Sequence, residues 1–146
     1  MEIVELPISK IEEIGELWHE LNMHHARSSC QFKGDVTSYS FERCRKRLLE
    51  NEKLAVFVAK NDDHIVGYCV SSVNKSSGEI DSLFLLPEYQ GKNIGNELTT
   101  HAINWLNSHD CSEINIYVAE GNESVFKFYE KFGFKKKYYV LQAKNS

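Results

Sequence analysis

The residues QGKNIG, from Gln90 to Gly95, lie between an apolar segment that ends in a proline and a run with helical spacing. The first turn of a helix leaves several backbone N–H groups without partners, and the helix dipole adds roughly half a positive charge there. Glycine at positions 91 and 95 lets an anion approach those N–H groups closely. These residue types therefore fit the binding of a phosphate or pyrophosphate.

A purely structural interpretation of the same segment stays open. Pro87 would end the strand, Gly91 would form a turn, and Gly95 would let a helix pack closely on a sheet. Two nucleotide-binding motifs are excluded. The segment lacks the Gly-Lys-Ser/Thr ending of a P-loop, and its glycine spacing differs from the three-glycine dinucleotide fingerprint.

The adjacent histidines and the four cysteines of the chain do not indicate a metal site or thiol chemistry. His24 and His25 are adjacent, so on a helix they point in different directions, and no third ligand is evident. We therefore predict no metal site. The four cysteines lack the paired spacing of zinc or redox motifs, which predicts reduced thiols in a cytoplasmic protein: Cys30, Cys44, Cys69 and Cys111.

Length and composition predict one globular domain over residues 1–146. Hydrophobic residues make up 42% and charged residues 26% of the chain, close to the average for folded proteins. The net charge of −4 argues against nucleic-acid binding, which needs a strongly basic face. No apolar run reaches the roughly 18 residues of a membrane span, and the N-terminus lacks a signal-peptide pattern. We expect no membrane partner and no export.

Hydrophobic periodicity predicts the elements that position these residues. Ser9 and Glu12 form a capping-box pattern ahead of a helix over residues 10–25, and residues 26–40 show no period. The expected order is β-α-α-β-β-β-α-β-α-β. It comprises strands at 2–6, 53–73 (two, in a hairpin), 80–86, 113–119 and 138–141, with helices at 10–25, from 41, 94–108 and 124–132.

This order predicts the α/β (α+β) class, with a mixed central sheet flanked by helices on both faces. The unit made of strand 80–86, helix 94–108 and strand 113–119 must be a right-handed parallel crossover.

Two motifs in this order resemble the GNAT superfamily of acyl-CoA-dependent N-acyltransferases. The family signature is Gln or Arg, two residues, Gly, one residue, then Gly or Ala, and it is matched by Gln90, Gly91, Lys92, Asn93, Ile94 and Gly95. The block NESVFKFYEKFGF, from Asn122 to Phe134, is similar to the late motif of the family. One departure is Asn93, where the family usually has glycine. Asparagine tolerates a left-handed backbone, so the loop can keep its shape.

The resemblance implies acetyl-CoA as cosubstrate. Its pyrophosphate would lie on the backbone of Gln90 to Gly95 and its pantetheine arm along the strand at Phe84 and Leu85. Lys92 would add charge near a phosphate, although a surface lysine is the alternative. Asn122 would hydrogen-bond the pantetheine arm or, alternatively, cap a helix.

A general base is needed because an alkylammonium with a pKa near 10.4 is almost fully protonated at pH 7, a deficit of roughly 4 to 5 kcal/mol. Glu79, six residues before Leu85, matches the position of a glutamate base in several GNAT members. Asp81 is on the same strand face two residues later. An ordered water or another residue stays an alternative to both.

The resemblance also assigns an acid and an acceptor pocket. Tyr129 occupies the position of the general acid that protonates the CoA thiolate, although packing between Phe128 and Phe132 is the simpler reading of that tyrosine. A backbone N–H near Leu85 would stabilise the oxyanion. His24 or His25, with Phe32, Tyr39 and Phe41, would line the acceptor pocket.

We therefore expect direct acetyl transfer to a primary amine of a small molecule: a polyamine, amino acid, amino sugar or aminoglycoside. A protein N-acetyltransferase and a non-catalytic acyl-CoA-binding module are the alternatives. The apolar segment from Tyr138 to Leu141 would either close the sheet or pair across a possible homodimer.

Overall fold

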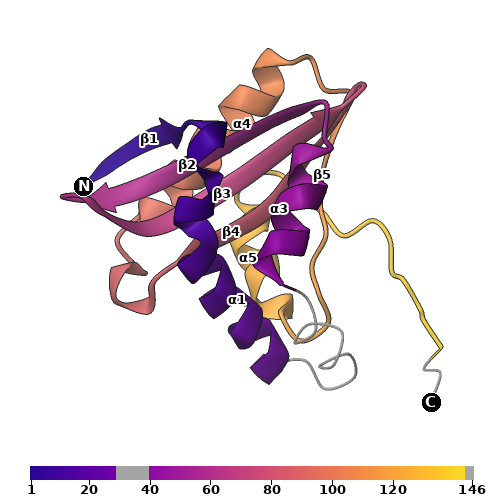
Figure 1. Cartoon of the computed structure of the whole chain (residues 1–146). Coiled ribbons are helices and arrows are strands. Elements are labelled where there is room, and N and C mark those ends of the chain that lie inside the picture. Colours follow the sequence, from indigo (N-terminus) through magenta and orange to yellow (C-terminus); the bar gives the residue numbers. More distant parts are fainter. Residues whose placement is uncertain (29–39, 144–146) are drawn as a thin grey trace.

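The computed structural model of the chain describes residues 1–28 and 40–143. Five strands in these ranges form one sheet in the order β1-β2-β3-β4-β5 (Figure 1). The elements, with η for a 3-10 helix, are β1 (Glu2–Leu6), η1 (Ile8–Ile14), α1 (Gly15–Ser28), α3 (Phe41–Leu49), β2 (Lys53–Asn61), β3 (His64–Asn74), β4 (Ser77–Leu85), η2 (Pro87–Tyr89), α4 (Ile94–Ser108), β5 (Glu113–Ile116), η3 (Glu123–Val125) and α5 (Phe126–Glu130).

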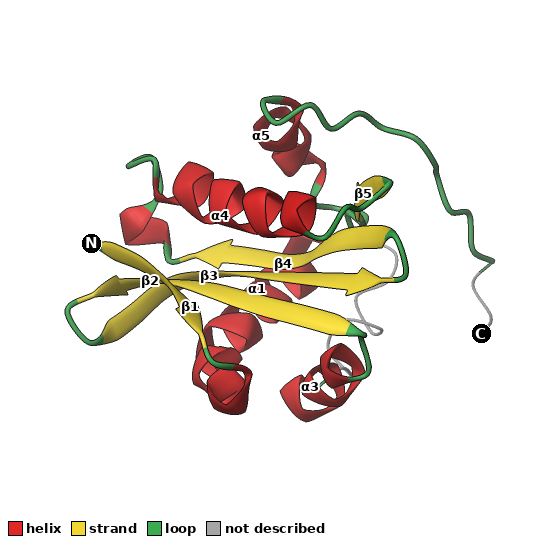
Figure 2. Cartoon of the chain, turned by 90° about the horizontal axis from the view of Figure 1, so that it is seen from above, coloured by secondary structure: helices red, strands yellow, loops and turns green. Residues whose placement is uncertain are grey.

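Three layers make up the molecule, as Figure 2 shows: α1 and α3 lie on one face of the sheet, and α4 and α5 lie on the other. Neighbouring strands run antiparallel from β1 to β4, and β4 pairs with β5 in parallel. The parallel pair is joined through α4. The predicted class, mixed sheet and parallel crossover are therefore confirmed.

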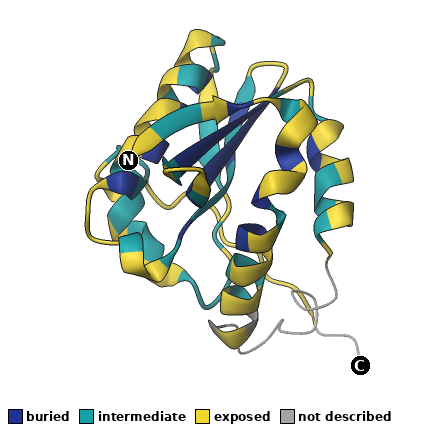
Figure 3. Ribbon diagram, turned by 60° about the vertical axis from the view of Figure 1, so that its left-hand side comes forward, coloured by how far each residue is buried: buried dark blue, intermediate teal, exposed yellow. Residues whose placement is uncertain are grey.

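The strands β2 and β3 are buried on both faces over most of their length, and dark blue marks buried strand residues in Figure 3. Along β2, Val56 and Val58 pack with η1, α1 and α3, whereas Ala55, Phe57 and Ala59 pack with α4. Side chains alternate between the faces of a strand, so this near-continuous apolar run serves two cores at once. Neither core is complete without its helices.

The helix α4 has the predicted limits and the predicted buried face. Ile94, Leu98, Ala102 and Leu106 recur every four residues, are at most 5% exposed and pack on the sheet. Their spacing keeps one stripe of the helix toward the core. This packing fixes where the first turn of α4, and hence the Gln90–Gly95 loop, lies relative to β4.

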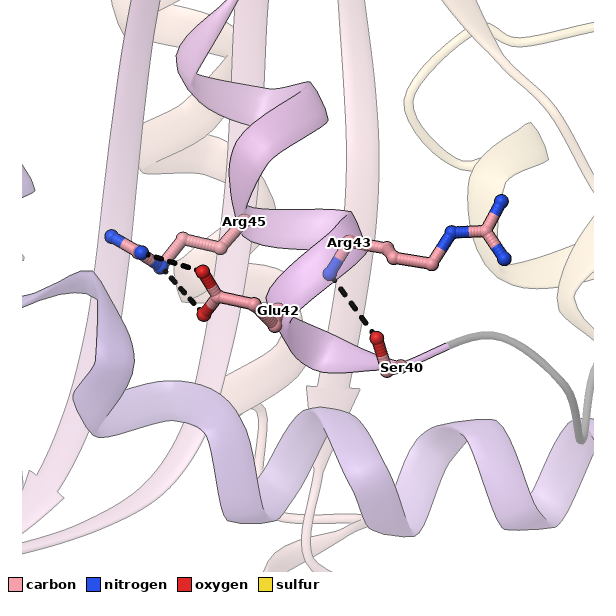
Figure 4. A network of polar contacts seen from close by, with 4 residues as sticks. All are labelled: Ser40, Glu42, Arg43 and Arg45. Carbon is pink, nitrogen blue, oxygen red and sulfur yellow. Dashed lines mark hydrogen bonds and ion pairs between the residues drawn. The ribbon is translucent and has the colours of Figure 1, made fainter.

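The helix α3 begins at a Ser40 cap, as Figure 4 shows in detail. The Ser40 hydroxyl accepts a hydrogen bond from the Arg43 N–H at 3.2 Å, and Glu42 forms an ion pair with Arg45 at 2.8 Å. The pair is solvent-exposed and therefore contributes little to stability. Arg45 therefore lies on an outer face of α3, while Leu48 packs inward.

Three details of the predicted order are wrong. Residues 135–143 form neither helix nor strand, and the side chains from Tyr138 to Leu141 are 79–95% exposed. A strand needs a partner strand and a face to bury, and the described part of the chain gives this segment neither. The strand expected over 113–119 ends at Ile116.

The first helix also begins differently from the prediction. It starts as the 3-10 helix η1 with Pro7 at the N-cap and no side-chain cap hydrogen bond, so the capping box of Ser9 and Glu12 is not formed. Lys10 has non-helical dihedral angles (φ −110°, ψ 17°). Burial of Ile11 and Ile14 dictates this geometry in place of the local cap.

Candidate active site

A cleft of about 1000 Å³ opens where β4 and β5 separate. The two strands pair only from Ser77 to Ile80 and from Glu113 to Ile116, after which β4 continues to Leu85 while β5 has ended. Residues 81–85 form one wall of the cleft and residues 116–119 the opposite wall. A parallel pair that splits leaves backbone N–H and C=O groups of β4 without a partner strand.

Backbone direction decides which residues of β4 offer those groups to the cleft. The Leu86 N–H donates to the Val66 carbonyl at 2.9 Å, so residues 86 and 84 direct their backbone groups toward β3. Residues 85 and 83 consequently direct theirs toward the open edge. Leu83 was not among the predicted residues. Phe84, which was predicted, directs its backbone groups toward β3 and lines the cleft.

Most of the predicted site residues come together in this cleft. It is lined by His25, Asp81, Phe84, Leu85, Gln90, Gly91, Asn93, Gly95, Asn122 and Tyr129. Ile94 is 5% exposed and packs in the core, and Lys92 is exposed, with its ammonium 5.9 Å from the centre of the Tyr89 ring. Glu79 lines a neighbouring cavity. Phe32, Tyr39 and Cys30 lie outside the described residues.

The loop before α4 has the backbone shape that its sequence predicted. Gly91 has φ +79°, and nothing lies within 4 Å of the place where its Cβ would be. Asn93 adopts the left-handed conformation (φ 68°), which confirms the prediction that asparagine keeps this backbone shape. The Gln90 amide donates to the Leu85 carbonyl at 3.0 Å and so fastens the loop to the end of β4.

The structural alternative for Gly95 is not supported. A Cβ at Gly95 would lie 3.6 Å from the Phe128 ring, an ordinary van der Waals contact with α5 and not a clash with the sheet. Packing therefore does not require glycine at this position. The Asn93 side chain makes no cap hydrogen bond to the first turn of α4, so that turn keeps its capacity to bind an anion.

Lys131 is a cleft residue that sequence reasoning missed. Its ammonium donates to Asn96 Oδ1 at 3.2 Å and lies 4.8 Å from the centre of the Phe128 ring. This places a positive charge beside the first turn of α4. Lys131 lies within the late motif, but the sequence shows only that it is charged. Its contact with Asn96, 35 residues earlier, could not be predicted from local sequence.

A β-bulge at Asp81 orients the polar residues of β4. The pairing with β3 shifts between Val70 and Ser71, where Asp81 has no partner residue. Ser82 then hydrogen-bonds the hydroxyl of Tyr68 at 2.8 Å on the α1 face, while Leu83 packs on the α4 face. The bulge thus directs two consecutive polar side chains to the α1 face, where regular alternation would direct one.

Glu79 and Asp81 share a smaller cavity of about 310 Å³ between the sheet, α1 and α3. We call it the side cavity. Asp81, Ser82 and His25 line both the side cavity and the cleft, so the two spaces adjoin at these residues. Arg47 and Asn22 add further polar groups to the side cavity.

The two carboxyl groups favour a shared proton. Burial, followed by the negative charge of Glu79, raises the pKa of Asp81 to about 7, while a hydrogen bond from Ser72 opposes the rise. Burial also raises the pKa of Glu79, against the effects of Asp81 and Arg47. Asp81 Oδ2 is buried and has no hydrogen-bond partner among the described residues. A carboxylate poised near pH 7 beside a cavity suits a general base.

Tyr129 is half-buried at the opposite side of the cleft. Its ring packs edge-on against Phe128 and Phe134, with centroids 5.2 and 6.0 Å away. Burial raises the pKa of its hydroxyl above the ordinary value of 10, so it stays protonated at neutral pH. The packing role is therefore real and does not exclude proton donation.

Asn122 meets His25 across the cleft. The Asn122 amide nitrogen lies 3.4 Å from His25 Nε2, although the two residues are 97 positions apart. Asn122 occupies the N-cap of η3 but makes no cap hydrogen bond, so the helix-cap alternative is not realised. Its neighbour His24 also lines the cleft, with the two imidazole rings 6.2 Å apart and tilted by 52°.

The described cysteines are free thiols of low reactivity. Burial raises the pKa of Cys69 to about 12 and that of Cys44 to about 11. Both thiols are therefore neutral at pH 7, and neutral thiols are poor nucleophiles. This agrees with the prediction of reduced thiols at these two positions.

The described helices include none that is both long and apolar enough to cross a bilayer.

Comparisons with known proteins agree with this geometry. The family model described as "Acetyltransferase (GNAT) family" matches residues 18–134. An uncharacterized N-acetyltransferase of Archaeoglobus fulgidus is 32% identical over 66% of this chain and 67% of its own length. A Bacillus subtilis protein, provisionally named as an alanine N-acetyltransferase of ribosomal protein bS18, is 29% identical over 59% of this chain. That match spans only 57% of the relative.

A solved structure shows the same fold over the whole chain. The aminoglycoside N-acetyltransferase AAC(6')-Iy in complex with CoA superposes with a TM-score of 0.69 at 17% identity, covering 99% of each chain. The family model covers most of the chain and includes both motifs. The chain therefore belongs to the GNAT family of acetyltransferases.

Proposed function

We propose that residues 1–146 form one N-acetyltransferase domain that transfers the acetyl group of acetyl-CoA directly to a primary amine of a small molecule. One observation carries this proposal. A single cleft joins an anion-binding helix start at Gly91 to Gly95 with the buried Asp81 carboxyl group. Cofactor binding and amine deprotonation thus have adjoining sites.

Acetyl-CoA fits the long axis of the cleft. The N–H groups from Gly91 to Gly95 would bind its pyrophosphate, with Lys131 and Lys92 supplying positive charge. Its pantetheine arm would pair with the open-edge backbone groups of Leu83 and with the Asn122 amide, next to Leu85. The complex of AAC(6')-Iy with CoA supports the same cofactor for this chain.

The amine would lose its proton to the carboxyl pair. Asp81 is the better candidate of the two, because it lines the cleft and its pKa of about 7 matches the pH at which transfer is needed. Glu79 tunes that pKa from the side cavity, and a water molecule between the amine and Asp81 Oδ2 is the alternative route. The acceptor would lie between His25 and the side cavity.

Attack of the free amine on the thioester carbonyl forms a tetrahedral oxyanion. The Leu85 N–H faces the open edge of β4 and would donate to that oxygen. Collapse breaks the C–S bond, and the Tyr129 hydroxyl would give its proton to the departing thiolate. No acyl-enzyme is needed for this direct transfer, and the thiols of Cys44 and Cys69 are neutral.

A protein N-terminus is the second candidate acceptor. The Bacillus subtilis relative is provisionally named as an alanine N-acetyltransferase of ribosomal protein bS18, and the same carboxyl pair would deprotonate an α-amino group. An α-amino group has a pKa near 8, so it needs less help from the base. A non-catalytic acyl-CoA-binding module and a homodimer stay open as predictions.

Calorimetric titration with acetyl-CoA, followed by thiol-release assays against amines and peptides, tests the proposal. We expect saturable binding and CoA release with at least one small primary amine. Release with peptides alone would replace the small-molecule acceptor by a protein N-terminus. Binding without release on a broad panel would favour the non-catalytic module, and no binding would contradict the role of the Gln90–Gly95 loop.

A further inference from the structure

His25 joins the two walls of the cleft through one side-chain contact. It lies on α1, lines both the cleft and the side cavity, and approaches Asn122 at the start of η3. The Asn122 Nδ2 to His25 Nε2 distance is 3.4 Å, and the contact is partly buried. The helix α1, beside which the acceptor would bind, thus contacts Asn122, which would bind the pantetheine arm.

The chemistry of this contact specifies the state of the imidazole. An asparagine Nδ2 can only donate, so His25 Nε2 must accept through a lone pair, and the ring proton must be on Nδ1. Burial, followed by the charge of His24, lowers the pKa of His25 from its ordinary value of 6.5. Both effects favour the neutral ring that the hydrogen bond requires.

Among the described residues close to it in sequence, none forms a hydrogen bond with the Asn122 side-chain amide that is comparable to the contact with His25. It makes no cap hydrogen bond to η3, which is three residues long and is followed by the five-residue α5. The Asn122 N–H donates to the Ala119 carbonyl at 3.0 Å, which fixes the main chain but leaves the side-chain torsions free. The contact with His25 is thus what orients the amide.

We infer that His25 is a positioning residue whose neutral imidazole holds the Asn122 amide at the cleft, so that protonation of His25 weakens the binding of acetyl-CoA. A protonated ring donates from both nitrogens and cannot accept from Asn122 Nδ2. The effect on acetyl-CoA rests on the proposed function. The effect on Asn122 does not.

Other titratable and charged groups line the cleft or the side cavity together with His25 and enter the interpretation of any pH effect. They include His19, Glu20, His24 and Arg27 on α1, Glu79 and Asp81 on β4, Cys44 and Arg47 on α3, Tyr129 on α5 and Lys131 after it. Asp81 titrates near pH 7, above the range expected for His25. Variants of His25 itself are therefore needed to separate the two titrations.

Nuclear magnetic resonance of the unliganded protein tests the contact directly. We expect the imidazole of His25 to carry its proton on Nδ1 above about pH 7 and the Asn122 side-chain amide to shift with the same midpoint as that ring. The His25→Gln variant should abolish this titration, and the matched His24→Gln variant should retain it. A proton on Nε2, or an Asn122 amide that ignores His25, would overturn the inference.

Calorimetry with acetyl-CoA tests the consequence. We expect the unmodified protein to bind about three- to tenfold more weakly at about pH 5 than at about pH 8, the size of one lost hydrogen bond. His25→Gln keeps an acceptor oxygen and cannot titrate. It should bind acetyl-CoA within about twofold of the parent at the higher pH. At the lower pH it should not show the loss of affinity that comes from protonation of His25.

The remaining variants separate the outcomes. His25→Ala should bind about three- to tenfold more weakly at the higher pH. His24→Gln should keep the decline at low pH, with its midpoint moved to higher pH because the charge that lowers the pKa of His25 is gone. The inference would be overturned if the affinity of His25→Gln for acetyl-CoA fell at low pH as much as that of the parent. It would also be overturned if His25→Ala bound acetyl-CoA as tightly as the parent. If His25→Ala does not fold, the result for His25→Gln decides. A parent that binds no acetyl-CoA would refute the proposed function, while the magnetic resonance result still decides the His25–Asn122 contact.

Discussion

Asp81 is a buried carboxyl group with an oxygen that has no partner among the described residues, and this has consequences for both turnover and stability. Its ionised form is disfavoured by burial and by Glu79, which raises its pKa to about 7. Above that pH the group can accept a proton from an amine. The same ionisation works against folding.

Turnover should therefore rise with pH through about 7 and depend on Asp81. We expect Asp81→Asn to lower kcat by about 100-fold or more, since positioned bases contribute at least that much. Glu79→Gln should shift the rise in the pH–rate profile to lower pH, because it removes the charge that raises the pKa of Asp81. Exposed Glu88→Gln is the matched control. An unchanged profile in both Glu79→Gln and Asp81→Asn would contradict the account.

Stability should respond to Asp81→Asn in the opposite direction. A carboxyl group whose pKa is raised by folding gives stability that is full below its unfolded value, near 3.9, and is lost as the pH rises through about 7. Asparagine has no such titration, so the variant should be more stable than the parent at pH 8, by at most about 4 kcal/mol. Thermal unfolding at pH 4 and pH 8 measures this. A variant less stable at pH 8 would show that the carboxylate makes favourable contacts.

Tyr129 tests the proton donor. Tyr129→Phe keeps the ring contacts with Phe128 and Phe134 and removes only the hydroxyl. We expect kcat to fall about tenfold, a modest effect because thiolate is already a fair leaving group, while the Kd for acetyl-CoA stays within about twofold. Tyr138→Phe, at an 81% exposed site, should change neither. Equal rates for the two variants would remove Tyr129 from the mechanism.

At the scale of elements, the first turn of α4 carries the claim about the cofactor. Gly95→Ala should fold and bind acetyl-CoA, because its Cβ would only touch the Phe128 ring at 3.6 Å. Gly95→Asp places a negative charge where the pyrophosphate would bind, so affinity should fall at least tenfold, about 1.4 kcal/mol. An acidic residue in the first turn also favours the helix dipole, so the loss would not reflect unfolding. Equal affinities for both variants would move the pyrophosphate elsewhere.

The elements also show which local signals can be trusted. The α4 limits were predictable because apolar residues at four-residue spacing, a loop of turn residues and burial all agree there. The capping box of Ser9 and Glu12 was a local pattern overruled by the burial of Ile11 and Ile14. The bulge at Asp81 had no local signal, since it depends on the register between β3 and β4.

For the whole molecule, the core and the C-terminal segment should respond differently to deletion. Truncation after Lys137 removes side chains that are 79–95% exposed from Tyr138 to Leu141, so the free energy of unfolding should change by less than about 0.5 kcal/mol. Leu98→Ala, at a fully buried site, should cost about 2–5 kcal/mol. Chemical denaturation measures both. A large loss on truncation would show that this segment packs on the domain.

Contacts between distant segments mark what sequence reasoning could not reach. The order of elements, the cleft loop and the GNAT motifs follow from spacing and residue type over short ranges. The His25–Asn122 contact and the Lys131–Asn96 hydrogen bond join residues 97 and 35 positions apart. The last strand failed as a prediction because alternation and β-propensity do not reveal whether a partner strand is available.

The most direct test of the account is to incubate the protein with deuterated acetyl-CoA and a panel of primary amines, and to identify products by mass spectrometry. The account predicts a deuteroacetylated small amine whose formation falls about 100-fold or more in Asp81→Asn and persists in Glu88→Gln. Tight binding of acetyl-CoA with no acetylated amine or peptide, at any pH between about 6 and about 9, would contradict it.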